Sequence, residues 1–250
     1  MVRFEIYAFR CGTLSSMNDY PDWMKAVEQT YVVKFPKQHL ATFGTTNINY
    51  YVVTEPIYTA IDPEKKELEG VIRKGRVIAE KPALITPRYA MNLSGFSDDA
   101  YDYMKRAAQI YGPNSPGILY KYRKEEGNLD VVSGIPQEIA WNISNELDRK
   151  KDNLSVVMVG IDEFWDVALL KFIYEFTSSS ISYNTREFDS SGLMNPIASS
   201  GGIPKAAVNQ IEDMFRSVQK GGSVDTLKDE LDKWGIFEHY EERFLDLFRG

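Results

Sequence analysis

The sequence predicts an α+β protein, with a mixed-strand N-terminal part that carries packed helices and an all-helical C-terminal part. Alternating apolar residues in the first half are typical of half-buried strands, as in residues 48–52. Beyond residue 203, apolar residues recur every three to four positions, which is typical of helices. A composition of 43% hydrophobic and 26% charged residues indicates a folded, soluble chain of one large or two small domains.

The first half contains most of the predicted strands. Residues 2–8 alternate between apolar and polar side chains, and residues 47–55 do the same before Pro56 ends the strand. Two short apolar runs on either side of Lys74-Gly75 predict a β-hairpin over residues 71–81. A second hairpin is predicted around Gly127, and residues 154–160 favour a buried strand.

Helices are predicted where a cap and an apolar stripe coincide. Ser97 is a good N-cap for residues 97–110, which end at Gly112-Pro113. Trp23, Val27 and Tyr31 lie at helical spacing, and Pro136 opens a further helix that ends in basic residues.

The Ser- and Gly-rich residues 177–202 predict a flexible joint. Three amphipathic helices follow, the first after Pro204, the second capped by Ser223 and stopped by Gly235, and the third up to the C-terminus. We therefore expect an α+β domain over residues 1–150 and a helical part over residues 151–250 that contains the joint.

Charge and rare residues exclude several classes of function. The net charge of −7 divides into +4 over residues 1–124 and −11 over residues 125–250, which does not suit a uniformly basic nucleic-acid-binding protein. One cysteine, Cys11, and two histidines, His39 and His239, exclude an internal disulfide and the usual zinc cages. No phosphate-binding glycine motif, membrane-length apolar run or signal peptide is present, so we expect a cytoplasmic protein with no cofactor and no membrane contact.

The acidic segment that starts at Asp162 has two interpretations. Asp162, Glu163 and Asp166 would share one face of a helix and could contribute to a metal site, although a hard cation needs more oxygen ligands. The interpretation that we favour is a helix N-terminus, in which Asp162 caps and the other two carboxylates interact with the helix dipole.

A binding surface is the stronger functional hypothesis. Tyr51 and Asn49 share one side of a strand, where phenol and amide groups suit recognition. Arg73, Lys74 and Arg76 at the predicted hairpin tip could contact phosphate or an acidic partner, although charges there also protect a sheet edge. We therefore expect a non-enzymatic binding or regulatory protein with a protein partner or a homo-oligomer, the alternative being a metal-dependent hydrolase that uses the clustered carboxylates.

Overall fold

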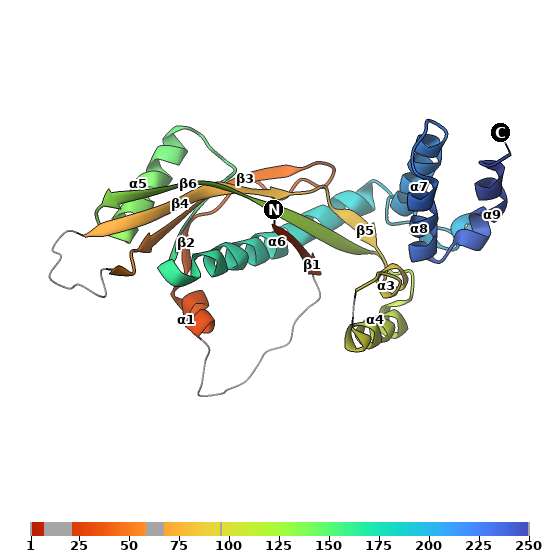
Figure 1. Cartoon of the computed structure of the whole chain (residues 1–250), viewed down its shortest axis with the longest axis horizontal. Helices are drawn as coiled ribbons and strands as arrows, with labels where there is room; N and C mark the ends of the chain where they lie inside the picture. Colours follow the sequence, from red (N-terminus) through yellow and green to blue (C-terminus); the bar gives the residue numbers. More distant parts are fainter. Residues whose placement is uncertain (1, 8–21, 59–67, 96, 250) are drawn as a thin grey trace. The chain divides into compact units, whose positions relative to one another are not determined.

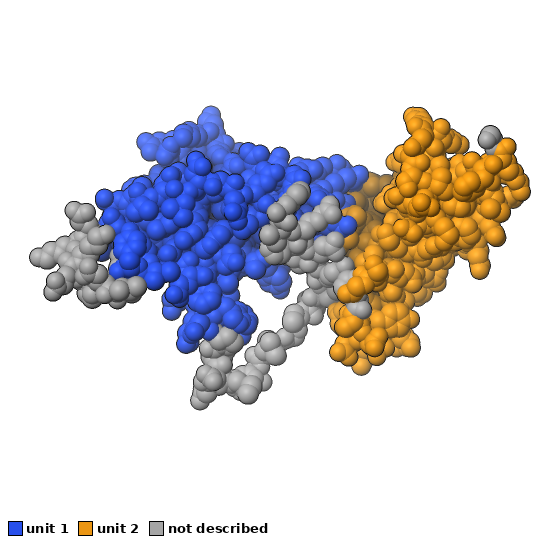
Figure 2. All heavy atoms as spheres, viewed as in Figure 1, with its two compact units in different colours: residues 1–82, 120–184 blue, residues 83–119, 185–250 orange. Residues whose placement is uncertain are grey.

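The fold is α+β in the computed structural model, which describes residues 2–7, 22–58, 68–95 and 97–249 (Figure 1). The contacts divide the chain into two compact units (Figure 2), and each unit is built from two separate segments of the chain. Unit 1 comprises residues 1–82 and 120–184, and unit 2 comprises residues 83–119 and 185–250. The boundary expected at residue 150 therefore falls inside unit 1.

A mixed sheet of seven strands has the order β1-β6-β4-β3-β7-β2, and β5 pairs with β6. Within it β3 and β7 are parallel, whereas β2–β7, β3–β4, β4–β6 and β5–β6 are antiparallel. The strands are β1 Val2–Tyr7, β2 Tyr31–Lys34, β3 Thr46–Glu55, β4 Glu69–Ala79, β5 Ala83–Ile85, β6 Gly117–Ser133 and β7 Ser155–Ile161. A separate two-stranded sheet pairs β8 Pro196–Ile197 with β9 Ile203–Pro204.

Most helices lie at the predicted positions, but the one near the N-terminus ends early. There the helix stops at Gln29 and Tyr31 begins an edge strand instead of continuing the helical stripe. The described helices are α1 Asp22–Gln29, α3 Pro87–Met91, α4 Asp98–Tyr111, α5 Pro136–Arg149, α6 Trp165–Ser190, α7 Lys205–Val218, α8 Val224–Trp234 and α9 Phe237–Asp246, with short 3₁₀ turns at Asp162–Phe164 and Ala198–Ser200. No helix in this described part is long and apolar enough to cross a membrane.

The predicted hairpin over residues 71–81 is wrong, because β4 runs without a turn through Lys74-Gly75. Gly75 is required for close approach rather than for turning. A Cβ atom on Gly75 would lie 2.3 Å from the hydroxyl oxygen of Tyr50 and 2.5 Å from the carbonyl oxygen of Glu125. Glycine therefore allows the strands on both sides to pack against β4.

The second predicted hairpin, around Gly127, is also wrong, because β6 is one strand of 17 residues. The pairing with β4 shifts register between Arg73, which lies opposite Leu129, and Gly75, which lies opposite Glu126. This irregularity is a β-bulge at Gly127, where a Cβ atom would lie 2.8 Å from the carbonyl oxygen of Lys74. Glycine in a strand thus marks a bulge here and not a chain reversal.

The Ser-rich segment from Thr177 to Ser190 is helical and not a joint, since α6 continues to Ser190. The buried hydroxyls are satisfied along the helix itself. Thr177 donates to the carbonyl oxygen of Ile173 at 2.6 Å, and Ser180 donates to that of Phe176 at 2.8 Å. Hydroxyl groups that bond to the preceding turn are compatible with a helix when the surroundings require one.

Two helices cover the two faces of the sheet in unit 1. On one face, Ile139, Ala140 and Leu147 of α5 form a core with β3, β4 and β7. On the other face lies α6, where Tyr122 of β6 bonds to Thr177. The core of unit 2 forms instead between helices α7, α8 and α9, through the residues Ile203, Ala207, Ile211, Phe215, Leu227, Leu231, Trp234, Ile236, Tyr240 and Phe244.

Candidate functional site

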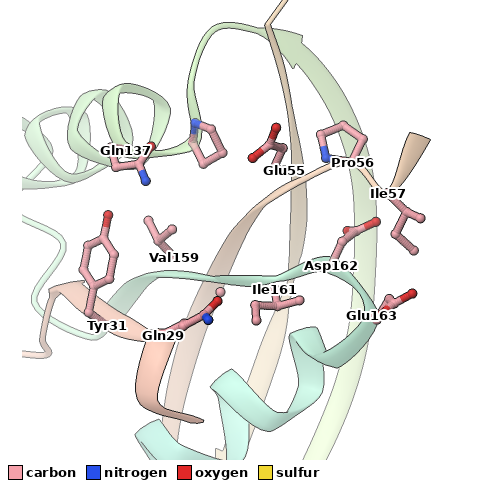
Figure 3. Close-up of a pocket in the computed structure, with 12 residues that line it drawn as sticks. Gln29, Tyr31, Glu55, Pro56, Ile57, Gln137, Val159, Ile161, Asp162 and Glu163 are labelled. Carbon is pink, nitrogen blue, oxygen red and sulfur yellow. The ribbon is translucent and has the colours of Figure 1, made fainter. Parts of the chain in front are cut away.

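A cleft of about 520 Å³ lies in unit 1 at the carboxyl ends of the parallel strands β3 and β7 (Figure 3). The parallel register places Glu55 opposite Ile161, so both strands end at the same edge. Pro56 prevents β3 from continuing there, because proline cannot donate a ladder hydrogen bond. Crevices outside the carboxyl ends of parallel strands are frequent ligand sites in open sheets.

The lining combines carboxylates, amides and apolar side chains from six elements, which are α1, β2, β3, α5, β7 and the 3₁₀ turn Asp162–Phe164. In Figure 3 the carboxylates of Glu55, Asp162 and Glu163 lie toward one side, and Tyr31 and Gln137 lie toward the other. No basic residue is among the described residues that line the cleft. These residues are Gln29, Tyr31, Glu55, Pro56, Ile57, Pro136, Gln137, Val159, Gly160, Ile161, Asp162 and Glu163.

Asp162 is held by strands β3 and β4 and does not cap a helix. Its Oδ1 accepts from Arg73 Nη1 at 2.5 Å and from the hydroxyl of Thr54 at 2.6 Å, and Arg73 also donates to Thr54 at 3.0 Å. The side chain of Asp162 is only 11% exposed and that of Arg73 19%. The predicted capping role was therefore wrong, because an interior arginine competes more strongly for this carboxylate than backbone amides do.

Trp165, the first residue of α6, also contacts Arg73. The guanidinium of Arg73 lies 5.6 Å from the centre of its ring, and the ammonium of Lys124 lies 4.7 Å from it. Tyr50 stacks against this indole, with 6.4 Å between the ring centres. The pKa of Tyr50 is raised, mainly by burial and in addition by the negative charge of Glu126. These cation–π contacts stabilise the positive charges of Arg73 and Lys124 on the face of the sheet that α6 covers, and they fix the start of α6 beside the cleft.

The predicted binding residues fall on both faces of the sheet. Tyr51 lies opposite Lys74 and Asn49 opposite Arg76, so these four side chains share one face. Arg73 points to the other face, toward Asp162. Lys74 pairs with Asp130 at 2.5 Å, and Arg76 is exposed. The structure thus brings Asn49, Tyr51, Lys74 and Arg76 together but separates Arg73 from them.

Of the three acidic candidates, Asp162 and Glu163 line the cleft together and Asp166 does not. Glu163 is exposed and lines the cleft, whereas Asp166 is exposed in the first turn of α6 and is not among the cleft residues. Within the described ranges, no three histidine, cysteine, aspartate or glutamate residues lie together as metal ligands would. Cys11, the one cysteine of the sequence, lies outside the described residues.

Sequence reasoning missed the cleft as such, and with it Tyr31, Glu55 and Gln137. These residues belong to β2, β3 and α5, which only the parallel pairing of β3 with β7 brings together. The signal that was available is Glu55-Pro56 at the end of a strand, a position where polar residues often line ligand sites. No local pattern specifies which strand will lie beside it.

Comparisons of the chain with protein-family models, with curated proteins and with solved structures found no match.

Proposed function

We propose that this chain is a non-enzymatic binding protein that takes a positively charged ligand in the cleft at the ends of β3 and β7. The observation that carries the proposal is the lining itself, in which the described residues contribute three carboxylates and no basic side chain around about 520 Å³. Concave sites with apolar walls and a few convergent polar groups are the usual form of ligand sites.

The chemistry of the ligand follows from the distribution of charge and apolar surface. Glu163 is exposed, so it can meet a cation without the large desolvation penalty of a buried charge. Ile57 and Tyr31, which are 45% and 43% exposed, provide surface for an apolar body beside the charge. A ligand that joins an ammonium or guanidinium group to a short hydrocarbon chain fits both features.

The third carboxylate supports binding better than catalysis. Asp162 already accepts hydrogen bonds from Arg73 and Thr54, so the lone pairs of its Oδ1 are partly used. A carboxylate in such a pair fixes the wall of the cleft and adds little free negative charge. No observation favours the metal-dependent hydrolase, and the cytoplasmic location and the regulatory role remain predictions.

Isothermal titration calorimetry with agmatine, a guanidinium and an ammonium group on a short alkyl chain, tests the proposal, with glutarate as the anionic control. Agmatine is expected to bind, more weakly at high salt because exposed charges are screened. Glu163→Gln should weaken agmatine binding about two- to fivefold, since one exposed ion pair contributes up to ~1 kcal/mol.

The matched control is Asp166→Asn, which removes another exposed carboxylate one turn away and outside the cleft. This variant should bind agmatine as the parent does. If Asp166→Asn weakened agmatine binding as much as Glu163→Gln does, the effect would come from the net charge of the protein and not from the cleft. Glutarate that bound as tightly as agmatine would contradict the proposed ligand class.

A further inference from the structure

Strand β6 is far longer than the strand on its outer side. Of its 17 residues, Tyr122 to Ser133 pair with β4 along one edge, with Glu69 of β4 opposite Ser133 at the far end. The neighbour on the opposite edge is β1, which has six residues. Figure 1 draws β1 beside the N-terminal half of β6. Among the described strands, none therefore lies along the outer edge of residues 129–133.

Two large apolar side chains on this segment face solvent. Leu129 is 58% and Val131 51% exposed, and both point to the same face of the sheet because they are two residues apart. Open strand edges are usually protected by lysine, proline or a covering element. Residues 129–133 have the sequence Leu-Asp-Val-Val-Ser, which contains neither lysine nor proline.

The segment is also regular enough to accept another strand. The β-bulge lies before it, at Gly127, and from Leu129 to Ser133 the pairing with β4 advances one residue at a time. Five residues are close to the usual length of a paired strand in proteins. The edge of residues 129–133 is thus a regular template with exposed apolar side chains on one face.

We propose that a second copy of this chain pairs with this edge, antiparallel about a twofold axis at Val131. Val131 then lies opposite Val131 of the partner subunit, and Leu129 lies opposite the partner's Ser133. Both apolar side chains of each copy come together on one face, and the two sheets become continuous. A twofold axis makes the interface self-complementary, as closed dimers require.

The charges favour a second copy in this register. Asp130 falls opposite the partner's Val132, so no carboxylate faces another across the axis. Asp130 is in addition paired with Lys74 at 2.5 Å, which compensates its charge on the opposite face from Leu129 and Val131. Because only five residues pair, the interface is small, and the dimer should form in a concentration-dependent way.

Size-exclusion chromatography with light scattering on the full chain, over a range of concentrations, tests the proposal. The parent chain should shift from monomer to dimer as concentration rises. Val131→Lys and, separately, Leu129→Lys should remain monomeric throughout, because lysine on an exposed edge opposes pairing. Trp141→Lys is the matched control, since Trp141 is 61% exposed on α5 of the same unit and should leave the dimer unchanged.

A cross-link tests the register independently of stability. In a Cys11→Ser background, Val131→Cys should form a disulfide-linked dimer on oxidation, because directly opposed residues in antiparallel strands have Cα atoms within disulfide range. Trp141→Cys should cross-link far less. A parent chain that stays monomeric, a dimer that survives both lysine variants, or equal cross-linking of the two cysteine variants would overturn the proposal.

Discussion

The interiors of the two units are built differently. In unit 1, α6 buries apolar side chains such as Phe172 and, in addition, polar groups, among them Ser180 and Asn184, which are both 0% exposed. In unit 2, the buried cluster of α7, α8 and α9 is apolar, and Glu230, only 7% exposed, lies beside it. Polar groups specify a geometry because each must find its partner, whereas apolar packing tolerates more rearrangement.

Asn184 shows how fully the polar contacts of unit 1 are satisfied. Its Nδ2 donates to the carbonyl oxygen of Leu40 and to the hydroxyl of Thr42, both at 2.7 Å, and its Oδ1 accepts from Tyr120 at 2.7 Å. Ser180, one turn earlier, accepts from the backbone amide of Leu40 at 3.1 Å. These bonds fasten the segment before β3 to α6.

The largest effect is expected from Asn184→Ala. The substitution leaves three buried groups without partners, at roughly 1–3 kcal/mol each, so the free energy of unfolding should fall by about 4 kcal/mol. Urea unfolding followed by circular dichroism measures the change. Ser178→Ala, at an exposed position of the same helix, is the control and should change stability by less than about 0.5 kcal/mol. A loss as small for Asn184→Ala would show that water replaces these bonds.

A smaller effect is expected in unit 2 from Glu230→Gln. Glu230 accepts from the indole N–H of Trp234 at 3.1 Å, from Gln210 at 3.2 Å and from the hydroxyl of Tyr89 at 3.4 Å. An amide removes the charge and presents a donor where only donors converge, which should cost about 1–2 kcal/mol. Thermal unfolding of this variant beside Asp229→Asn, an exposed neighbour, isolates the effect. Equal midpoints for the two variants would mean that the buried carboxylate is not required.

The smallest effect concerns Tyr122 and depends on pH. Burial raises the pKa of Tyr122 to about 12, although the bond to Thr177 opposes the shift. Since an unfolded tyrosine ionises near pH 10, this contribution to stability is complete below about pH 10 and is lost as pH rises toward 12.

Tyr122→Phe cannot ionise at this position. It should be about 1 kcal/mol less stable than the parent at pH 8, because the hydrogen bond to Thr177 is lost. That gap should close as pH approaches 12. Urea midpoints measured at both pH values check this, and a gap that widens with pH would contradict the assignment.

Local patterns predicted the elements whose structure depends on neighbours in sequence. Ser97 and Ser223 cap helices as expected, because their hydroxyl oxygens accept hydrogen bonds from the backbone N–H groups of Ala100 and Thr226. Strand β3 has the predicted buried face, with Ile48, Tyr50 and Val52 all nearly inaccessible. In each case the physical signal lies within a few residues, in a cap or in an alternation.

The errors share a different cause. A glycine such as Gly75 or Gly127 looks the same in the sequence whether it forms a turn, a β-bulge or a close approach between strands. Only the neighbouring strands show which of the three structures forms. Thr177 and Ser180 are typical of a linker by residue type. In the structure their hydroxyls donate to carbonyl oxygens of the preceding turn of α6, which packs on the sheet. Arg73 was grouped with Lys74 because of the hairpin, whereas a continuous strand places adjacent side chains on opposite faces.

The sequence by itself determined the α+β class, the positions of most helices and the division of charge, because composition and periodicity are local properties. Only the tertiary structure decided that β3 and β7 lie parallel, that their ends form the cleft, and that Asp162 bonds to Arg73 rather than capping a helix. These features join residues up to about a hundred positions apart. Which distant partner a residue finds depends on the packing of the whole sheet, and no short window of sequence contains that information.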